Sequence, residues 1–339
     1  MILKTISEQI EDSSIIHLFF ITRKLKDNTK KTDRVLDKFD FTAYQVDVND
    51  EIRKYLRELT EKHLSKMVKS DYDMEDYDVL TDDSHKVLTY QMENKKMSFA
   101  NVVTEQLLNK PSKIKDVVDL VAKGEEIWAY SVGFYSKKET NQWIYTFRKV
   151  LSGKVAVDAK SNPETSKMDK TIRTVFNTQT QKLELLKGQT INLDTTVDCI
   201  YFNDTFYIKN KRQFEQIIGL EEEFKEEARQ VVTKLQELDV IEGLDLISEQ
   251  IEDHPPIHKK LVRISKIGNY RDINRATLNK MKAVSKAYGS NLKVKNNKLV
   301  IEDKNDIELV LKMLSDYYKR GEVSGKPYGT YAGKQIEQS

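Results

Sequence analysis

Two blocks of opposite charge follow each other in the second half of the chain and limit how that half can fold. Residues 215–253 contain thirteen acidic and three basic residues, a local net charge of −10. Residues 254–298 contain twelve basic residues and one acidic residue, a local net charge of +11. The whole chain has a net charge of only +2, so the total hides a strong segregation of charge. Both blocks must therefore lie on elements that keep a charged face outward.

Apolar residues recur within both blocks at every third or fourth position, which is helical spacing. In the acidic block this spacing predicts an amphipathic helix over residues 221–239 with an acidic outer face. Pro255-Pro256 then breaks the chain. In the basic block a helix is predicted to begin at Asp272, a favourable N-cap residue, and to run to Tyr288, with Gly289 ending it.

Pairs of strand-like runs separated by short polar segments occur in both halves and predict antiparallel hairpins. The first joins residues 126–135 to 142–150, with Trp128 and Trp143 expected as core anchors. The second, within residues 196–209, turns at Asn203-Asp204. A third hairpin, over residues 292–301, turns at Asn296-Asn297. Since strands and helices do not alternate regularly, the sequence predicts an α+β fold of antiparallel hairpins packed with amphipathic helices.

A chain of 339 residues is expected to form two domains, because single cores rarely grow so large. Residues 160–170 are small and polar and include a proline, so we place the linker there. The expected division is an N-terminal α+β domain over residues 1–160 and a C-terminal domain over residues 161–339. The C-terminal domain contains the basic segment 254–298.

The apolar runs are too short for a membrane span of roughly 18 residues, and the first residues lack the layout of a secretory signal. We therefore expect a cytoplasmic protein. The single cysteine, Cys199, cannot form an internal disulfide or a multi-thiolate metal site, and it is expected in the core.

The predicted helix of the basic block carries a cationic face. Arg275, Lys282 and Lys286 fall within about 60° of one another, on the side opposite Met281 and Val284. Such a surface suits a phosphate backbone, because each neutralised phosphate releases condensed counterions without any reading of bases. The predicted DNA-binding residues are Lys259, Lys260, Arg263, Lys266, Arg271, Arg275, Lys282, Lys286, Lys293 and Lys295. Two alternatives stay open: an ordinary solvated face, or a surface that docks on the acidic helix of the same or a second subunit.

The common catalytic motifs of nucleotide hydrolases, dinucleotide-binding enzymes, zinc proteases and serine hydrolases are absent from the sequence. We therefore predict a protein that is not an enzyme and has no metal or cofactor. The competing hypothesis is a metal-dependent nuclease built on Asp198, Asp204 and Lys209. Pro255-Pro256 separates His254 from His258 and argues against one helical turn that would place both rings on a metal.

Three stretches resemble the KwaB-like family of bacterial Kiwa defence proteins. They are residues 197–209 (VDCIYFNDTFYIK), residues 214–218 (FEQII), and residues 311–318 (LKMLSDYY) followed by residues 324–328 (SGKPY). The last stretch is the most specific, with serine where the family pattern leads us to expect asparagine. The resemblance covers about the C-terminal half of the chain.

The resemblance implies a non-catalytic DNA-binding subunit of an antiphage complex, which forms at least a homodimer. It also implies a small transmembrane partner, a KwaA-like subunit, that would hold this chain at the inner face of the cell membrane. No individual functional residue is carried over from the family, because the match lies at positions that define the fold. A pure scaffold without affinity for nucleic acid is the third class of function that the sequence leaves open.

Overall fold

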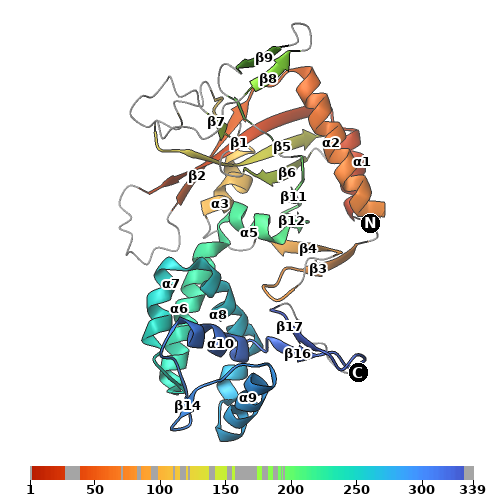
Figure 1. The fold of residues 1–339 in the computed structure, drawn as a ribbon. Helices are drawn as coiled ribbons and strands as arrows, with labels where there is room; N and C mark the ends of the chain where they lie inside the picture. Colours follow the sequence, from red (N-terminus) through yellow and green to blue (C-terminus); the bar gives the residue numbers. More distant parts are fainter. Residues whose placement is uncertain are drawn as a thin grey trace. The chain divides into compact units, whose positions relative to one another are not determined.

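A computed structural model gives the fold of the chain as two compact units (Figure 1). Among the residues that the structure describes, the first unit holds those up to 74 and those from 87 to 218, and the second holds those from 75 to 86 and those from Gly219 onward. The structure describes residues 2–26, 39–69, 72–81, 85–92, 98–109, 111–114, 120, 123–136, 142–150, 155–156, 174–177, 182–185, 190–191, 193 and 195–331. In that part of the chain, no helix has both the length and the apolar character required to cross a bilayer.

The first unit is built on an eight-stranded sheet in the order β2-β1-β5-β6-β11-β12-β4-β3. Neighbouring strands from β2 to β4 are antiparallel. The strands are β1 (Ile15–Leu25), β2 (Phe39–Val46), β3 (Asp73–Asp76), β4 (Lys86–Gln91), β5 (Glu126–Tyr135), β6 (Trp143–Lys149), β11 (Cys199–Phe202) and β12 (Thr205–Ile208). Two small ribbons pair β7 (Val155–Ala156) with β10 (Thr190–Ile191) and β8 (Thr174–Asn177) with β9 (Lys182–Leu185).

Helices cover the sheet because alternate side chains of each strand point to opposite faces. On one face, α1 (Ile2–Glu11) and α2 (Asp50–Lys69) pack side by side and share a core with the strands (Figure 1). On the other face lie α3 (Ser98–Asn101), the π-helix η1 (Val102–Gln106) and α5 (Lys211–Ile218), and α3 and α5 contribute to a run of aromatic contacts. Phe99 of α3 contacts Phe147 with ring centroids 5.8 Å apart, and Phe214 of α5 contacts Phe206 at 5.3 Å.

The second unit is mainly helical. Its helices are α6 (Leu220–Leu238), α7 (Asp245–Asp253), α8 (Pro255–Ile267), the 3-10 helix η3 (Asn269–Asp272), α9 (Arg275–Ala287) and α10 (Lys304–Leu314). A small sheet joins β13 (Ile241–Glu242), β15 (Lys298–Val300) and β14 (Val294–Lys295), and a terminal hairpin joins β16 (Tyr318–Arg320) to β17 (Pro327–Gly329). One buried apolar cluster, which includes Leu235, Leu261 and Leu311, holds these elements together.

The predicted α+β class is confirmed, and so are the three hairpins. Asn203 and Asp204 have φ values of 50° and 56°, and Asn296 and Asn297 have 51° and 61°. Two consecutive left-handed residues are what a tight two-residue hairpin needs, and Asn and Asp tolerate that conformation. Cys199 is fully buried, as predicted.

Trp128 and Trp143 are only partly buried, so the prediction that both anchor the core is wrong. The indole N–H of Trp128 donates to the carbonyl of Gln216 at 3.0 Å, and Lys149 lies 3.4 Å from its ring centroid. Trp143 stacks on Tyr145 at 5.7 Å. Indole needs a polar partner for its N–H and favours positions at the edge of a core, and the smaller rings fill the interior.

The two units divide between Ile218 and Gly219, which is later than the expected boundary at residue 160. Strands on both sides of that boundary belong to one sheet, since β11 pairs with β6. The expected linker, residues 160–170, lies outside the described residues, and a break there stays a prediction.

Candidate nucleic-acid interface

Helix α9 carries the cationic face and begins two residues later than predicted. Its N-cap is Asn274, whose side-chain oxygen accepts hydrogen bonds from the backbone N–H groups of Ala276 at 2.9 Å and Thr277 at 3.1 Å. Asp272 instead ends the preceding 3-10 helix, and its carbonyl accepts a hydrogen bond from the Thr277 hydroxyl at 2.9 Å. The sequence holds two good capping residues here, and the 3-10 turn leaves only Asn274 in the extended conformation of an N-cap.

The buried side of α9 is formed by Leu278, Met281 and Ser285. The Ser285 hydroxyl accepts a hydrogen bond from the backbone N–H of Leu292 at 2.9 Å and ties the helix to the following hairpin. Val284, predicted on the core side, is only half-buried. The buried side of α9 is therefore rotated about the helix axis from the predicted side. Ser285 is buried in place of Val284, because its small side chain fits against the backbone of the hairpin.

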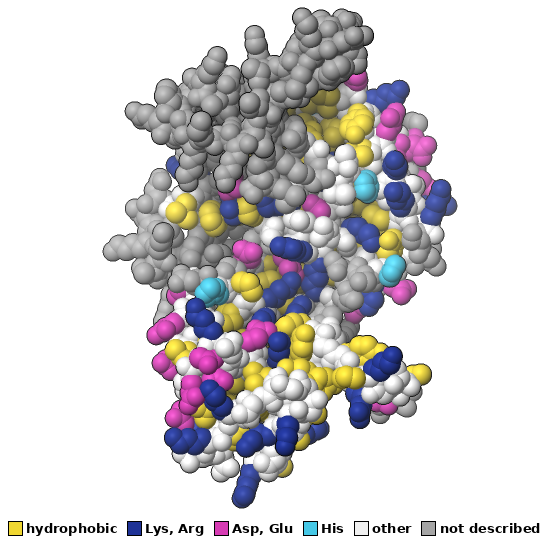
Figure 2. Space-filling model, viewed as in Figure 1, with side chains coloured by type: hydrophobic (Ala, Val, Ile, Leu, Met, Phe, Trp, Pro, Cys, Tyr) yellow, Lys and Arg dark blue, Asp and Glu magenta, His cyan; other side chains and the backbone are white. Residues whose placement is uncertain are grey.

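Arg275, Lys282 and Lys286 are all exposed on α9, and we call these three residues the cationic stripe. Helical geometry places the stripe about 90° around the helix from the buried side. Within the part of the chain that the structure describes, none of the three forms an ion pair. Figure 2 shows Lys and Arg side chains on the part of the second unit that carries α9, while acidic side chains gather over α6 and α7. The stripe is therefore open to an external anion.

Two of the predicted DNA-binding residues form ion pairs inside the second unit. Lys260 of α8 pairs with Glu308 of α10. Lys293 contacts Asp306 at 2.8 Å and Glu302 at 2.7 Å. The hydrogen bonds that the Lys293 ammonium donates to these two carboxylates raise the pKa of Lys293. Both lysines have their charge matched by acids of the same unit, so they are weaker candidates for phosphate contacts.

The remaining predicted residues differ in their surroundings. Arg263 donates from Nε to the Val79 carbonyl at 3.4 Å, and Lys259 lies 5.9 Å from the Phe224 ring centroid. Three others are exposed and without an ion pair among the described residues: Lys266, Arg271 and Lys295. Lys259, Lys260, Arg263 and Lys293 therefore contact side chains or backbone of the second unit. The other six predicted residues, which include the whole cationic stripe, are exposed and form no ion pair with a described residue.

Two cations of the acidic helix α6 and the acid at its C-terminal end are paired within the second unit. Glu252 of α7 accepts hydrogen bonds from Lys225 at 2.8 Å and Arg229 at 2.6 Å. Burial raises the pKa of Glu223, and the neighbouring Glu227 raises it further. Lys298 contacts Asp239, the C-cap residue of α6, at 2.5 Å and links the basic segment to the acidic helix. The remaining acidic side chains of α6 form a negative surface apart from the stripe (Figure 2).

The two carboxylates of the nuclease hypothesis do not converge, although Lys209 lies beside Asp198, where its backbone N–H donates to the Asp198 carbonyl at 2.9 Å. Asp198 is buried, and its carboxylate accepts a hydrogen bond from the backbone N–H of Lys149 at 2.8 Å. Asp204 lies in the turn at the other end of β11, where it accepts a hydrogen bond from the Tyr201 hydroxyl at 3.0 Å. The four residues of β11 separate the two carboxylates by about 13 Å of strand. The ammonium of Lys209 lies 3.6 Å from the Tyr72 ring centroid.

A metal site is also not formed by the histidines. His258 is buried and its Nε2 donates to the Ile251 carbonyl at 2.6 Å, whereas His254 is exposed at the junction of α7 and α8. Across the described ranges no group of three His, Cys, Asp or Glu residues is arranged to hold a metal ion.

The family model described as "Kiwa protein KwaB-like" matches residues 124–324, which is more than half of the chain. The match covers β5, β6, the β11-β12 hairpin and almost all of the second unit, including α9. No curated protein and no solved structure matches the chain.

Proposed function

The chain belongs to the KwaB-like family of Kiwa proteins, and on that premise we propose that it is the DNA-binding subunit of a Kiwa antiphage defence system. Membership of the family makes the chain a defence subunit. The proposal adds that DNA is held through its phosphates on the cationic stripe, without recognition of base sequence and without chemistry on the DNA.

This proposal rests on one observation: some cations of the second unit are paired with carboxylates, whereas others are exposed and form no ion pair with a described residue. Lys260 and Lys293 have their charges balanced by neighbouring carboxylates, whereas Arg275, Lys282 and Lys286 share one exposed helix face. An exposed cationic row on a rigid helix can meet successive phosphates, and each contact gains free energy by releasing counterions. Phosphate contacts position a protein on DNA but carry no sequence information.

The proposal also includes an assembly. We propose that the chain forms at least a homodimer and acts beside a transmembrane KwaA-like subunit. The negative surface of α6 and the cationic surface of the second unit supply complementary patches, and isologous contacts between copies are the commonest route to a dimer. Light scattering at micromolar concentration should give at least twice the chain mass of 39.5 kDa. A mass equal to one chain would remove the dimer from the proposal.

A gel-shift titration of the full chain with duplex DNA separates the three classes of function. The DNA-binding proposal expects a shift at low salt that weakens as salt rises, and intact plasmid after incubation with magnesium or manganese. Nicking of supercoiled plasmid that is lost in Asp198→Ala would instead establish the nuclease. No shift at the lowest salt would leave a scaffold as the function and refute the proposal.

A further inference from the structure

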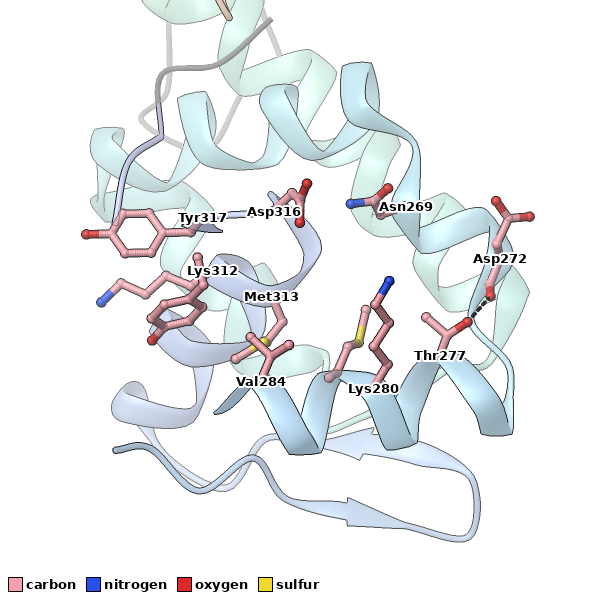
Figure 3. Close-up of a pocket in the computed structure, with 11 residues that line it drawn as sticks. Asn269, Asp272, Thr277, Lys280, Val284, Lys312, Met313, Asp316 and Tyr317 are labelled. Atoms are coloured by element: carbon pink, nitrogen blue, oxygen red, sulfur yellow. Dashed lines mark hydrogen bonds between the residues drawn. The ribbon is translucent and has the colours of Figure 1, made fainter. Parts of the chain in front are cut away.

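A cavity of about 290 Å³ lies inside the second unit, between η3, α9, the end of α10 and β16 (Figure 3). Its size is near the lower end of small-molecule sites, which span about 300–1,000 Å³. The cavity shares helix α9 with the cationic stripe but uses another side of that helix, where Lys280, Met281 and Val284 lie. The predicted DNA-binding residues did not include Lys280.

The cavity offers flat and apolar surfaces to a ligand. Met281, Met313 and Val284 line one side, and both methionines are buried. Tyr317 and Tyr318 form an aromatic wall, with ring centroids 5.2 Å apart and an edge-to-face arrangement. The ring of Tyr318 is held from behind by Tyr288 at 4.6 Å. Aromatic rings and thioethers of this kind favour the face of a planar ring system.

Three polar side chains point into the same space. Figure 3 shows Asn269 and Asp316 facing Lys280 across the opening. In the part of the chain that the structure describes, neither Lys280 nor Asp316 forms an ion pair, and the amide of Asn269 has no side-chain hydrogen bond. Asp316 has a left-handed backbone with φ of 51° at the turn that ends α10, which sets where its carboxylate lies. Opposite charges that face each other without contact leave room for a ligand that joins them.

We propose that this cavity binds a guanine base. Guanine is planar and presents two adjacent N–H donors, N1–H and the N2 amino group, which a carboxylate such as that of Asp316 can accept together. Its O6 and N7 acceptors are the partners that lysine most often contacts on this base, a role that Lys280 can take. The aromatic wall supplies stacking, which is sequence-tolerant by itself, so selectivity comes from Asp316 and Lys280.

Guanine can reach the cavity from two sources, a free guanine nucleotide or an unpaired guanine in DNA. The second source rests on the proposed DNA-binding function, because it requires a strand already held by the second unit. The first source does not depend on it. Both sources share the same base chemistry, and separate experimental arms distinguish them.

The experiment is a calorimetric titration of the full chain with GMP and, in parallel, with AMP. Saturable binding of GMP is expected, with AMP weaker by about tenfold or more, since it cannot give Asp316 two donors. Asp316→Asn and Lys280→Ala should each lower the affinity for GMP by about tenfold or more, because each removes a charge-assisted hydrogen bond. In the DNA arm, a single-stranded oligothymidine with one central guanine should compete with GMP, whereas pure oligothymidine should not.

Lys282→Ala is the matched control, since it removes a lysine two positions away on the same helix but outside the cavity. Lys282→Ala should leave the affinity for GMP unchanged and lower the affinity for duplex DNA. Circular dichroism should show that each variant is folded. Absence of saturable GMP binding to the wild-type chain, equal binding of GMP and AMP, or wild-type affinity in both cavity variants would overturn the proposal. Duplex binding by the same samples reports separately on the proposed DNA-binding function.

Discussion

Reversal of the cationic stripe, by Arg275→Glu, Lys282→Glu and Lys286→Glu together, should abolish most DNA affinity and leave the fold intact. All three side chains are exposed, and no ion pair holds them to any described residue. Surface substitutions of this kind usually change stability by about 0.5 kcal/mol or less each. The midpoint of thermal unfolding should therefore move by only a few degrees, about 2 °C per substitution at most.

The loss of binding can be worked from the number of phosphate contacts. Each lost contact on duplex DNA flattens the slope of log affinity against log salt by about 0.9, so three contacts give about 2.7. A fourfold rise in salt should then weaken the wild-type chain about 40-fold more than the reversed variant. Fluorescence anisotropy of a labelled random duplex at several salt concentrations measures both the affinity and the slope.

A matched triple reversal on α2 controls for net charge. Lys62, Lys66 and Lys69 are exposed and fall on one face of that helix, so their change to Glu alters the charge by the same amount. The control should keep most of the wild-type affinity and its salt slope. The reasoning is refuted if the stripe variant retains wild-type affinity and slope, or if the α2 variant loses as much as the stripe variant.

Three further predictions concern stability and reactivity. Partial burial raises the pKa of Glu252, but hydrogen bonds from Arg229 and Lys225 outweigh it and hold that pKa at about 2, below the usual 4.5. Because this pKa is lower in the folded chain than in the unfolded chain, the ionised Glu252 carboxylate stabilises the fold at pH values above its unfolded pKa, and this stability is lost as pH falls towards the folded pKa. Glu252→Gln should therefore lower the melting temperature at pH 7 and have less effect as pH approaches 2. Asn274→Ala should lower the free energy of unfolding by about 1 kcal/mol in urea titrations, whereas Asn274→Ser should keep most of it. Burial raises the pKa of Cys199, so a thiol reagent should modify it only after denaturation, and fast labelling of the native chain would contradict the fold.

Local rules were sufficient to predict much of the fold. Paired residues that tolerate positive φ, such as Asn203-Asp204, specify a tight hairpin wherever they occur between apolar runs. Helical spacing predicted α6 and α9 to within a few residues. The start of α9 was misplaced because both Asp272 and Asn274 can cap a helix. Only the 3-10 turn before them selects Asn274.

Long-range pairing is what the sequence could not supply. The eight-stranded sheet joins β11 to β6 across a segment with the composition of a linker, and composition says nothing about which distant strands pair. In the same way, the acids that pair with Lys260 and Lys293 come from residues 302–308, beyond the basic segment. Counting charge along the chain therefore could not separate these paired lysines from the stripe.

The cavity was also invisible in the sequence, because its polar groups come from three separate elements. Asn269, Lys280 and Asp316 lie on η3, on α9 and after α10, and no spacing rule links them. One weak signal was present: Asp316 follows the C-cap residue of α10, at the position where many helices end with a residue of positive φ.

The most direct test of the proposed DNA binding is the affinity of the wild-type chain for two unrelated duplexes of equal length over a range of salt concentrations. If phosphates on the stripe provide the affinity, both duplexes should bind equally at every salt concentration. Log affinity should then fall linearly with log salt, with a slope of about −2.7 or steeper. An affinity that does not change with salt, or a constant preference of more than about tenfold for one sequence, would contradict phosphate-based binding.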